Sequence, residues 1–324
     1  METSTSNRST ISAIVPTIGR PHSLRRLLES LCGQTCRVDE VIVADGSNND
    51  ETYKVVDEYR WQESNLTVKR IVVYPPNTVR QREAAIRTSQ GEFLLLLDDD
   101  VELEPECVER LLALLQTNPN VVGVTANFNN QSWSQPTRCW QLYLRYILGL
   151  KSEAWQGRVV GPLLRFGYNP VPANPQPMDW LGSGNSLVRH SAYSRAGGFS
   201  DFFLHRCTTN EDVDFGLKLS KLGRILFCPS ARMAHFQAPG GRVAPMKVAE
   251  DDLYNRYMVI RCTQGRSVVA AFGQILLYFT IETASNLGGC MRRFRTNGFG
   301  ARTFGRVRAL LRILLGMVPV KTNA

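Results

Sequence analysis

Three consecutive aspartates, Asp98, Asp99 and Asp100, form the pattern in this sequence that points most directly to chemistry. Adjacent carboxylates repel one another, and a bound divalent cation removes that cost. Carboxylate oxygens are the ligands that Mg²⁺ and Mn²⁺ prefer. In an extended segment side chains i and i+2 share a face, so Asp98 and Asp100 can address one site while Asp99 points elsewhere. The alternative is an acidic loop that only caps the helix expected after Pro105.

A second acidic cluster, Glu211, Asp212 and Asp214, follows Asn210. Acidic side chains in the first turn of a helix suit its dipole, and Asn is a favourable N-cap, so a purely structural role is one interpretation. The other is that a carboxylate of this cluster acts as a general base. A helix N-terminus keeps a carboxylate ionised, and a hydroxyl group that attacks a substrate needs such a partner.

His235 and the segment Gly182-Ser183-Gly184-Asn185 are weaker candidates. A neutral imidazole at His235 could complete a metal site and suits Mn²⁺ better than Mg²⁺, but a hydrogen-bonded structural histidine is equally compatible with the sequence. The two glycines allow either a tight turn or the close approach of a ligand. The sequence has no GxGxxG, no GxxxxGK[ST] and no GxSxG motif, which argues against Rossmann, P-loop and serine-hydrolase sites.

Alternating strands and helices are expected to position these residues. Short apolar runs occupy residues 11–15, 41–44, 71–74, 93–97 and 121–126, and helical periodicity starts at Pro21 and at Pro105. This pattern predicts an α/β fold with a mostly parallel sheet covered by helices on both faces. The carboxyl ends of such strands meet at one edge, where ligands bind, so we expect Pro16, Asp45 and Asp98 to converge.

The rest of the chain is less regular. Residues 127–179 are rich in proline and predict loops, whose side chains could select a substrate. A helix is expected over about 210–222, a strand over 224–228, and only helices after Glu250. The longest apolar run, residues 268–281, falls short of the ~20 residues of a membrane span and predicts a buried or interfacial helix.

Composition and charge limit the class of protein. The chain has 324 residues, of which 43% are hydrophobic and 21% charged, which excludes disordered, collagen-like and disulfide-scaffold proteins. The net charge is +9, and residues 283–324 hold eight basic residues and no acidic one. The N-terminal segment lacks an apolar signal core, so a cytoplasmic location is expected.

The basic C-terminal segment predicts an amphipathic helix over residues 304–318. Its apolar stripe would comprise Phe304, Val307, Leu310, Leu311, Leu314, Leu315 and Val318. Arg302, Arg306 and Arg312 would lie off this stripe, and Arg308 would border it. Such a helix either lies in an anionic membrane interface or packs on the catalytic domain with a solvated basic face. No nucleic-acid-binding module is recognisable, so no nucleic-acid partner is expected.

At this point the order of motifs resembles the family 2 glycosyltransferases of GT-A fold, over roughly residues 10–240. The matching segments lie at residues 13–17, 41–47, 82–86, 91–93, 97–100, 182–185, 197–199 and 210–215. One departure is that the family often has Arg-Asn and then Gly two residues on, where this chain has Arg82-Glu83 and Ala85.

The resemblance implies a role for each matching residue. It implies a donor-nucleotide site formed by Pro16, Thr17, Arg20, Asp45, Arg82, Asp98 and Asp99. It implies a divalent cation, Mn²⁺ or Mg²⁺, held by Asp98, Asp100 and His235, with Asp212 as the catalytic base. It implies an acceptor site formed by Trp180, Gly182, Ser183, Gly184, Asn185 and Glu211.

We therefore expect a metal-dependent, inverting glycosyltransferase that moves a sugar from a nucleoside diphosphate to a saccharide or lipid-linked saccharide. The catalytic domain would span residues 1–245, and a basic helical extension would span residues 246–324. Two alternatives remain open. One is a sugar-phosphate nucleotidyltransferase, which would carry a glycine-rich phosphate loop after the first strand. The other is a non-catalytic, metal-dependent carbohydrate-binding protein.

Overall fold

A nine-stranded sheet forms the centre of the computed structural model, within its described residues 9–61, 66–151, 153–238, 243–293 and 298–317. Its strands are β1 (Ile11–Thr17), β2 (Glu40–Asp45), β3 (Thr67–Val72), β4 (Phe93–Leu97), β5 (Val101–Leu103), β6 (Val121–Phe128), β9 (Gln176–Met178), β10 (Asn185–Arg189) and β11 (Arg224–His235). The order is β3-β2-β1-β4-β10-β6-β11-β5, and β9 also pairs with β11.

The sheet is mostly parallel, as the sequence predicts. Neighbouring strands among β3, β2, β1 and β4 are parallel, and β11 is parallel to β6. Strand β10 is antiparallel to both β4 and β6, so β6 again runs in the direction of β4. The carboxyl ends of the long strands therefore meet at one edge, which is where the acidic residues follow them in the sequence.

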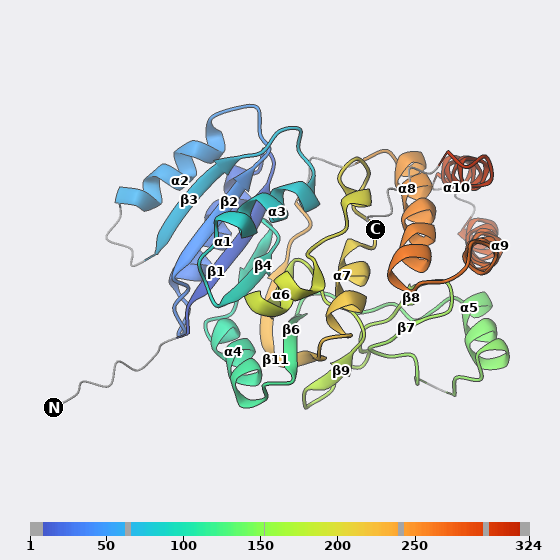
Figure 1. Ribbon diagram of the computed structural model, residues 1–324, viewed down its shortest axis with the longest axis horizontal. Helices are drawn as coiled ribbons and strands as arrows, with labels where there is room; N and C mark the ends of the chain where they lie inside the picture. Colours follow the sequence, from blue (N-terminus) through green and yellow to red (C-terminus); the bar gives the residue numbers. More distant parts are fainter. Residues whose placement is uncertain (1–8, 62–65, 152, 239–242, 294–297, 318–324) are drawn as a thin grey trace.

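Helices cover both faces of the sheet (Figure 1). They are α1 (Pro21–Cys32), α2 (Glu51–Trp61), α3 (Thr78–Thr88), α4 (Cys107–Thr117), α6 (His190–Ala196) and α7 (Glu211–Leu219). Alternate residues of β1 point to opposite faces: Ala13 and Val15 pack with α1, α2 and α4, whereas Ile14 packs with α3, α6 and α7. One hydrophobic core lies on each face of the sheet. Together they hold the strands in place, and with them the edge at which the strands end.

The predicted N-terminal helices are confirmed. Helix α1 begins at Pro21, and its four periodic leucines are buried. Helix α4 begins at Cys107, two residues after Pro105, and turns its periodic apolar residues inward. The strand predicted at residues 71–74 is wrong in position, because β3 spans Thr67–Val72 at the edge of the sheet. An edge strand needs few buried side chains, and β3 begins with polar residues, so a run of apolar residues does not mark where it starts.

Residues 127–179, predicted as loops, contain short elements. These are α5 (Arg138–Leu142), a π-helical turn (Tyr143–Ile147), a separate hairpin of β7 (Val159–Val160) and β8 (Leu164–Arg165), and β9. Elements of two to five residues are too short to show a period. Strand β11 is also longer than the predicted strand over 224–228, because it continues across a register shift to His235.

Three helices follow, as predicted for the residues after Glu250. They are α8 (Pro245–Met258), which continues as a π-helical turn (Val259–Thr263), α9 (Val268–Arg293) and α10 (Phe299–Leu314). Together with α5 they enclose a third core that includes Trp140, Tyr254, Tyr257, Ile275 and Ala309. The domain boundary proposed between residues 245 and 246 falls at the first turn of α8.

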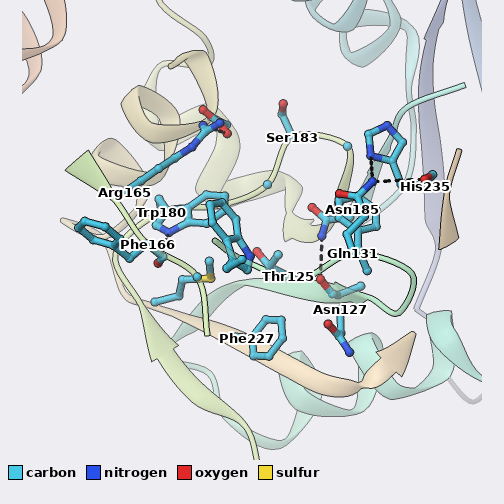
Figure 2. A pocket seen from close by; sticks show the side chains of 18 of the residues that line it. Thr125, Asn127, Gln131, Arg165, Phe166, Trp180, Ser183, Asn185, Phe227 and His235 are labelled. Carbon is cyan, nitrogen blue, oxygen red and sulfur yellow. Dashed lines mark hydrogen bonds and ion pairs between the residues drawn. The ribbon is translucent and has the colours of Figure 1, made fainter. Parts of the chain in front are cut away.

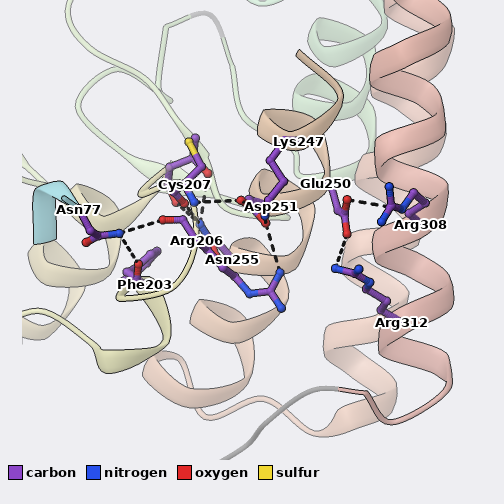
Figure 3. A network of polar contacts seen from close by, with 11 residues as sticks. Asn77, Phe203, Arg206, Cys207, Lys247, Glu250, Asp251, Asn255, Arg308 and Arg312 are labelled. Atoms are coloured by element: carbon purple, nitrogen blue, oxygen red, sulfur yellow. Dashed lines mark hydrogen bonds and ion pairs between the residues drawn. The ribbon is translucent and has the colours of Figure 1, made fainter. Parts of the chain in front are cut away.

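The orientation of α10 differs from that expected of a helix that packs through its apolar stripe, and the membrane-interface alternative stays a prediction. The buried side of α10 is formed by Gly305, Arg306, Ala309 and Ile313. Of the predicted stripe, Phe304, Leu311, Leu314 and Leu315 are exposed, whereas Leu310 packs partly against the third core. Arg308 and Arg312 contact Glu250 of α8 at 3.6 and 2.5 Å, as Figure 3 shows. The basic face is thus only partly solvated, because Arg306 is buried and Arg308 and Arg312 pair with Glu250. Val318 lies outside the described residues.

Helix α9 also differs from expectation. It runs unbroken for 26 residues, and its segment Val268–Gly288 is long and apolar enough to cross a membrane by length and composition, with a mean hydropathy of 1.4. Only 17% of the tested window is buried, so α9 is not the buried helix that was one of the two interpretations.

We predict that Gly216→Ala destabilises the fold, because α7 packs closely on the chain before β10. A Cβ atom at Gly216 would lie 2.6 Å from the Cα of Trp180 and 2.7 Å from the amide nitrogen of Leu181. Urea denaturation should show a loss of about 1–3 kcal/mol in the free energy of unfolding. Gly273→Ala in α9 is the control, because nothing lies within 4 Å of its added methyl group. Equal stability of Gly216→Ala and wild type would contradict the described packing.

Candidate active site

One cavity of about 740 Å³ is lined by residues of both acidic clusters (Figure 2). Asp98 follows β4, Glu211 and Asp212 begin α7, and His235 ends β11. The expectation that Asp98 and Asp212 meet at one cleft is confirmed. The sheet explains the meeting, since the ends of β4 and β11 and the segment before β10 lie along one edge.

Asp98, Asp100 and His235 form the predicted metal-ligand cluster. One potential ligand atom from each lies within 4.8 Å of the others. Burial alone would raise the pKa of Asp100, but hydrogen bonds from His235 and from the Ala238 amide outweigh it and lower that pKa. The hydrogen bond with Asp100 raises the pKa of the His235 imidazole. Two carboxylates and an imidazole form a donor set that suits Mn²⁺.

Asp99 points away from this cluster, as the side-chain alternation predicts. Its carboxylate accepts hydrogen bonds from Thr17 Oγ1 at 2.7 Å and Arg20 Nη1 at 3.0 Å. Burial raises the pKa of Asp99 to about 6, although Thr17 and Arg20 oppose the shift. No contact of the three aspartates with α4 is present among the described hydrogen bonds, so the helix-capping alternative is wrong.

Of the residues predicted to hold the donor nucleotide, Asp98 lines the cavity and the others do not. Pro16 and Thr17 end β1, and Asp45 ends β2, next to them in the sheet. The Asp45 carboxylate is fully buried and accepts a hydrogen bond from Arg70 Nε at 2.8 Å. Asp45 therefore holds the end of β2 to β3 in this structure, and a nucleoside contact by this residue stays a prediction.

Arg82 of α3 connects the two acidic clusters. Its Nη2 donates to Asp98 at 2.6 Å, and its Nη1 lies 3.4 Å from Glu211. The side chain is almost completely buried, so it lies beneath the cavity floor. The neighbouring departure from the family pattern is also explained, because Glu83 turns away and accepts hydrogen bonds from Tyr193 and the Phe199 amide.

Asp212 is paired with Arg165, a residue that the sequence analysis did not identify. The Arg165 guanidinium contacts one carboxylate oxygen, and the Val213 amide donates to the other at 2.9 Å. Arg165 lies in β8 with its guanidinium carbon 5.3 Å from the Trp180 ring centroid. The side chains of Arg165 and Trp180 both reach the cavity in Figure 2. Strands of two residues are too short to produce a recognisable sequence pattern, so the sequence did not indicate the position of Arg165.

Glu211 is enclosed to the same extent as Asp212, with 12% of each side chain exposed. Its Oε1 accepts a hydrogen bond from Ser183 at 2.9 Å. Burial, and then the negative charge of Asp212, raise the pKa of Glu211 to about 7, against the opposing effect of Arg82. The predicted N-cap role of Asn210 is wrong: its backbone is left-handed, with φ 70°, and its amide instead donates to Asp252 of α8 at 2.9 Å.

The glycines of the 182–185 segment allow close packing at the cavity. A Cβ atom at Gly184 would lie 2.2 Å from Asp98 Oδ2, and one at Gly182 would lie 1.9 Å from Asn185 Oδ1. Any side chain at Gly184 would therefore displace the first aspartate of the metal-ligand cluster. The Asn185 side chain donates to the Ala126 carbonyl oxygen at 2.7 Å and fixes the segment to β6.

A wall of aromatic and amide side chains completes the cavity. Its members include Asn127, Phe128, Gln131, Trp133, Phe166, Tyr168 and Phe227. Most belong to residues 127–179, where acceptor-selecting side chains were expected but could not be identified. The extension contributes too, because Asp252 and Arg256 of α8 line the same cavity.

Comparison with known proteins gives a family. The model of "Glycosyl transferase family 2" matches residues 12–166, which include Asp45, Arg82 and the three aspartates. These residues belong to glycosyltransferase family 2. The second acidic cluster and His235 lie outside residues 12–166. His235 and residues of that cluster line the same cavity as Asp98, which lies within that match.

The chain is also similar to curated proteins and, in fold, to solved structures. O-antigen biosynthesis protein RfbC of Myxococcus xanthus is 26% identical over 258 residues, covering 78% of this chain and 19% of the relative. The chain thus spans about a fifth of the length of that protein. Two structures share the GT-A fold: S. aureus TarS 1-349 in complex with UDP-GlcNAc (TM-score 0.58, 15% identity, 94% and 81% coverage) and GalNAc-T7 with UDP, GalNAc and Mn2+ (TM-score 0.57, 15% identity, 79% and 48% coverage).

We predict that Glu211→Gln changes the pH dependence of stability. The pKa of Glu211 is raised from 4.5 to about 7 on folding, so the folded protein binds this proton more tightly than the unfolded chain. The free energy of unfolding of the wild type should therefore fall as the pH rises from about 4.5 to about 7. The amide introduced by the substitution does not titrate, so this fall should be reduced in the variant.

The measurement is urea denaturation at pH 4.5, 6 and 8 in the presence of a chelator. Asp201→Asn, at an exposed position outside the cavity, is the control and should keep the wild-type slope. Parallel pH profiles for Glu211→Gln and wild type would show that Glu211 ionises normally in the fold.

Proposed function

We propose that this chain is a divalent-cation-dependent, inverting glycosyltransferase. It would transfer a sugar from a nucleoside diphosphate to a hydroxyl group of a saccharide or lipid-linked saccharide. The observation that carries the proposal is the shared cavity: Asp98 of the metal-ligand cluster and Asp212 of α7 line the same space. A cation-binding group and a base would then face one volume that can hold a sugar.

The metal-ligand cluster suits a bound Mn²⁺ or Mg²⁺. Asp98, Asp100 and His235 would hold the ion, and Arg82 keeps the Asp98 carboxylate in place through its 2.6 Å hydrogen bond. When bound, the cation would stabilise negative charge on the departing diphosphate as a Lewis acid. Gly184 leaves one Asp98 oxygen uncovered on the cavity side.

Asp212 is the base in this proposal. The Val213 amide donates a hydrogen bond to one of its oxygens, and a carboxylate accepts a proton from an attacking hydroxyl group. Before that step the Arg165 guanidinium occupies the other oxygen, so the arriving acceptor has to displace it. Attack from the Asp212 side, opposite the diphosphate, gives single displacement with inversion at the anomeric carbon.

The relatives support the substrate class. One of the two similar structures contains UDP, GalNAc and Mn2+, the other contains UDP-GlcNAc, and the Myxococcus relative is an O-antigen biosynthesis protein. We propose a nucleotide sugar as donor by this likeness and cell-envelope glycan assembly as the setting. The cytoplasmic location stays a prediction.

Two alternatives are less well supported. A sugar-phosphate nucleotidyltransferase would be expected to have a glycine-rich phosphate loop after β1, and residues 16–21 contain one glycine, Gly19. A non-catalytic carbohydrate-binding protein has no need for a second acidic cluster facing the metal-ligand cluster across the cavity. A thermal-shift screen of UDP-, GDP- and dTDP-sugars with Mn²⁺ selects the donor, and release of its nucleoside diphosphate then separates an enzyme from a binding protein.

We predict that Asp212→Asn abolishes most turnover and preserves donor binding. The amide keeps the size of the side chain but cannot accept the proton, so the rate should fall by about 10²–10⁴-fold. Nucleoside diphosphate release measures turnover, and calorimetry with the selected donor measures binding. Asp201→Asn is the control for a loss of negative charge elsewhere. Undiminished transfer by Asp212→Asn would refute its role as the base.

We predict that Asp100→Asn weakens the binding of donor only when the cation is present. The amide removes one anionic ligand, so the difference in donor affinity with and without Mn²⁺ should shrink at least tenfold. Calorimetry in Mn²⁺ and in chelator measures this difference. Glu102→Gln, an exposed acidic residue two positions away, is the matched control. An unchanged Mn²⁺ effect in Asp100→Asn would remove Asp100 from the cation site.

A further inference from the structure

The C-terminal extension and the neighbouring residues 138–147 expose apolar side chains that the proposed reaction does not use. Helix α5, with the π-helical turn that follows it, lies together with α9 and α10 along one edge of the molecule, on the right in Figure 1. The outer face, as we call this surface, comprises Leu142, Tyr146, Ile147, Val269, Leu276, Leu287, Phe304, Leu311, Leu314 and Leu315. Each of these side chains is at least 44% exposed, which is unusual for so many large apolar groups on neighbouring helices.

The outward side of α9 is uncharged along its described length. Its exposed residues recur at helical spacing: Val269, Gly273, Leu276, Thr280, Ala284 and Leu287. The inward side of α9 packs on the protein, where Ala271, Ile275 and Tyr278 are buried in the third core. Glu282, the acidic residue of this helix, accepts a hydrogen bond from Trp140 Nε1 at 3.0 Å and lies 3.6 Å from Arg306.

Helix α10 has the same organisation. Phe304, Leu311 and Leu314 point outward with 56, 52 and 63% of their surface exposed. Its arginines point inward or sideways, since Arg308 and Arg312 pair with Glu250 (Figure 3). The ion pairs of its arginines with Glu250 and Glu282 thus orient α10 so that its apolar side, and not its charged side, faces the solvent.

Charge identifies the occupant of this surface. Residues 253–324 contain eleven basic residues and one acidic residue, Glu282. Arg266 and Arg302, near the N-terminal ends of α9 and α10, are exposed. An apolar helix surface bordered by arginine is the composition that binds the interface of an anionic bilayer. A second copy of the chain fits less well, because a two-fold interface would bring two equally basic borders together.

We propose that the outer face binds the surface of an anionic lipid bilayer, with α9 and α10 lying in the interface. Spanning of the membrane by α9 is disfavoured, because it would strip Ile275 and Tyr278 from the third core and expose Glu282 to lipid. The membrane interface that was one of two alternatives for a tail helix is thereby assigned to the whole outer face.

The test is flotation of the full chain with preformed vesicles of phosphatidylcholine alone and of phosphatidylcholine with 30% phosphatidylglycerol. We expect recovery with the anionic vesicles to exceed that with the neutral ones. In the variant Val269→Gln/Leu311→Gln/Leu314→Gln the apparent affinity for anionic vesicles should fall by about tenfold or more.

The matched control is Val72→Gln/Tyr74→Gln, which removes two exposed apolar side chains at the far edge of the sheet and should bind like wild type. Circular dichroism of both variants checks their fold. Equal recovery with neutral and anionic vesicles would overturn the proposal. So would dimerisation that the triple variant abolishes without any vesicle binding, or resistance of the bound chain to carbonate extraction, which indicates a spanning helix.

Discussion

The buried guanidinium of Arg82 is the interaction on which the site depends. Asp98 comes from a segment more than a hundred residues away from Glu211 and Asp212, and the charges of the three repel one another at the edge of the sheet. Arg82 contacts Asp98 and Glu211 from below and compensates part of that charge. Removing one partner of a buried ion pair typically costs about 3–5 kcal/mol, because the other charge is left uncompensated. Arg165 compensates the remaining carboxylate, Asp212, from above, and an acceptor can reach that side.

Much of the α/β fold was predictable because its helices and strands bury apolar residues at regular spacing. The four leucines of α1, the buried runs of β1, β2 and β4, and the position of Asp98 at a strand end all follow from local patterns. The convergence of Asp98 with Asp212 followed from the rule that parallel strands end at one edge, although the roles of these residues are proposals. The prediction was least successful where tertiary context decides. Arg165 sits on a two-residue strand, Asn210 serves α8 instead of capping α7, and β3 owes its place to pairing with β2.

The C-terminal extension shows that an amphipathic pattern can be right although its large apolar residues are not the side that packs on the protein. The stripe of Phe304, Leu311 and Leu314 exists, but small residues, Gly305 and Ala309, form the buried side of α10. A close helix contact needs small side chains, and a sequence scan for large apolar residues misses it. Because Glu250 and Glu282 draw the arginines inward, the same helices can present apolar groups outward and supply Asp252 and Arg256 to the cavity.

The most direct test of the central claim is anomalous diffraction at the manganese edge from crystals of the chain with Mn²⁺ and the nucleoside diphosphate of its donor. The account predicts one strong peak in contact with Asp98, Asp100 and His235, with the diphosphate beside it and the Asp212 carboxylate across the same cavity. A peak bound elsewhere, or a diphosphate held on the opposite side of the sheet from Asp212, would contradict it.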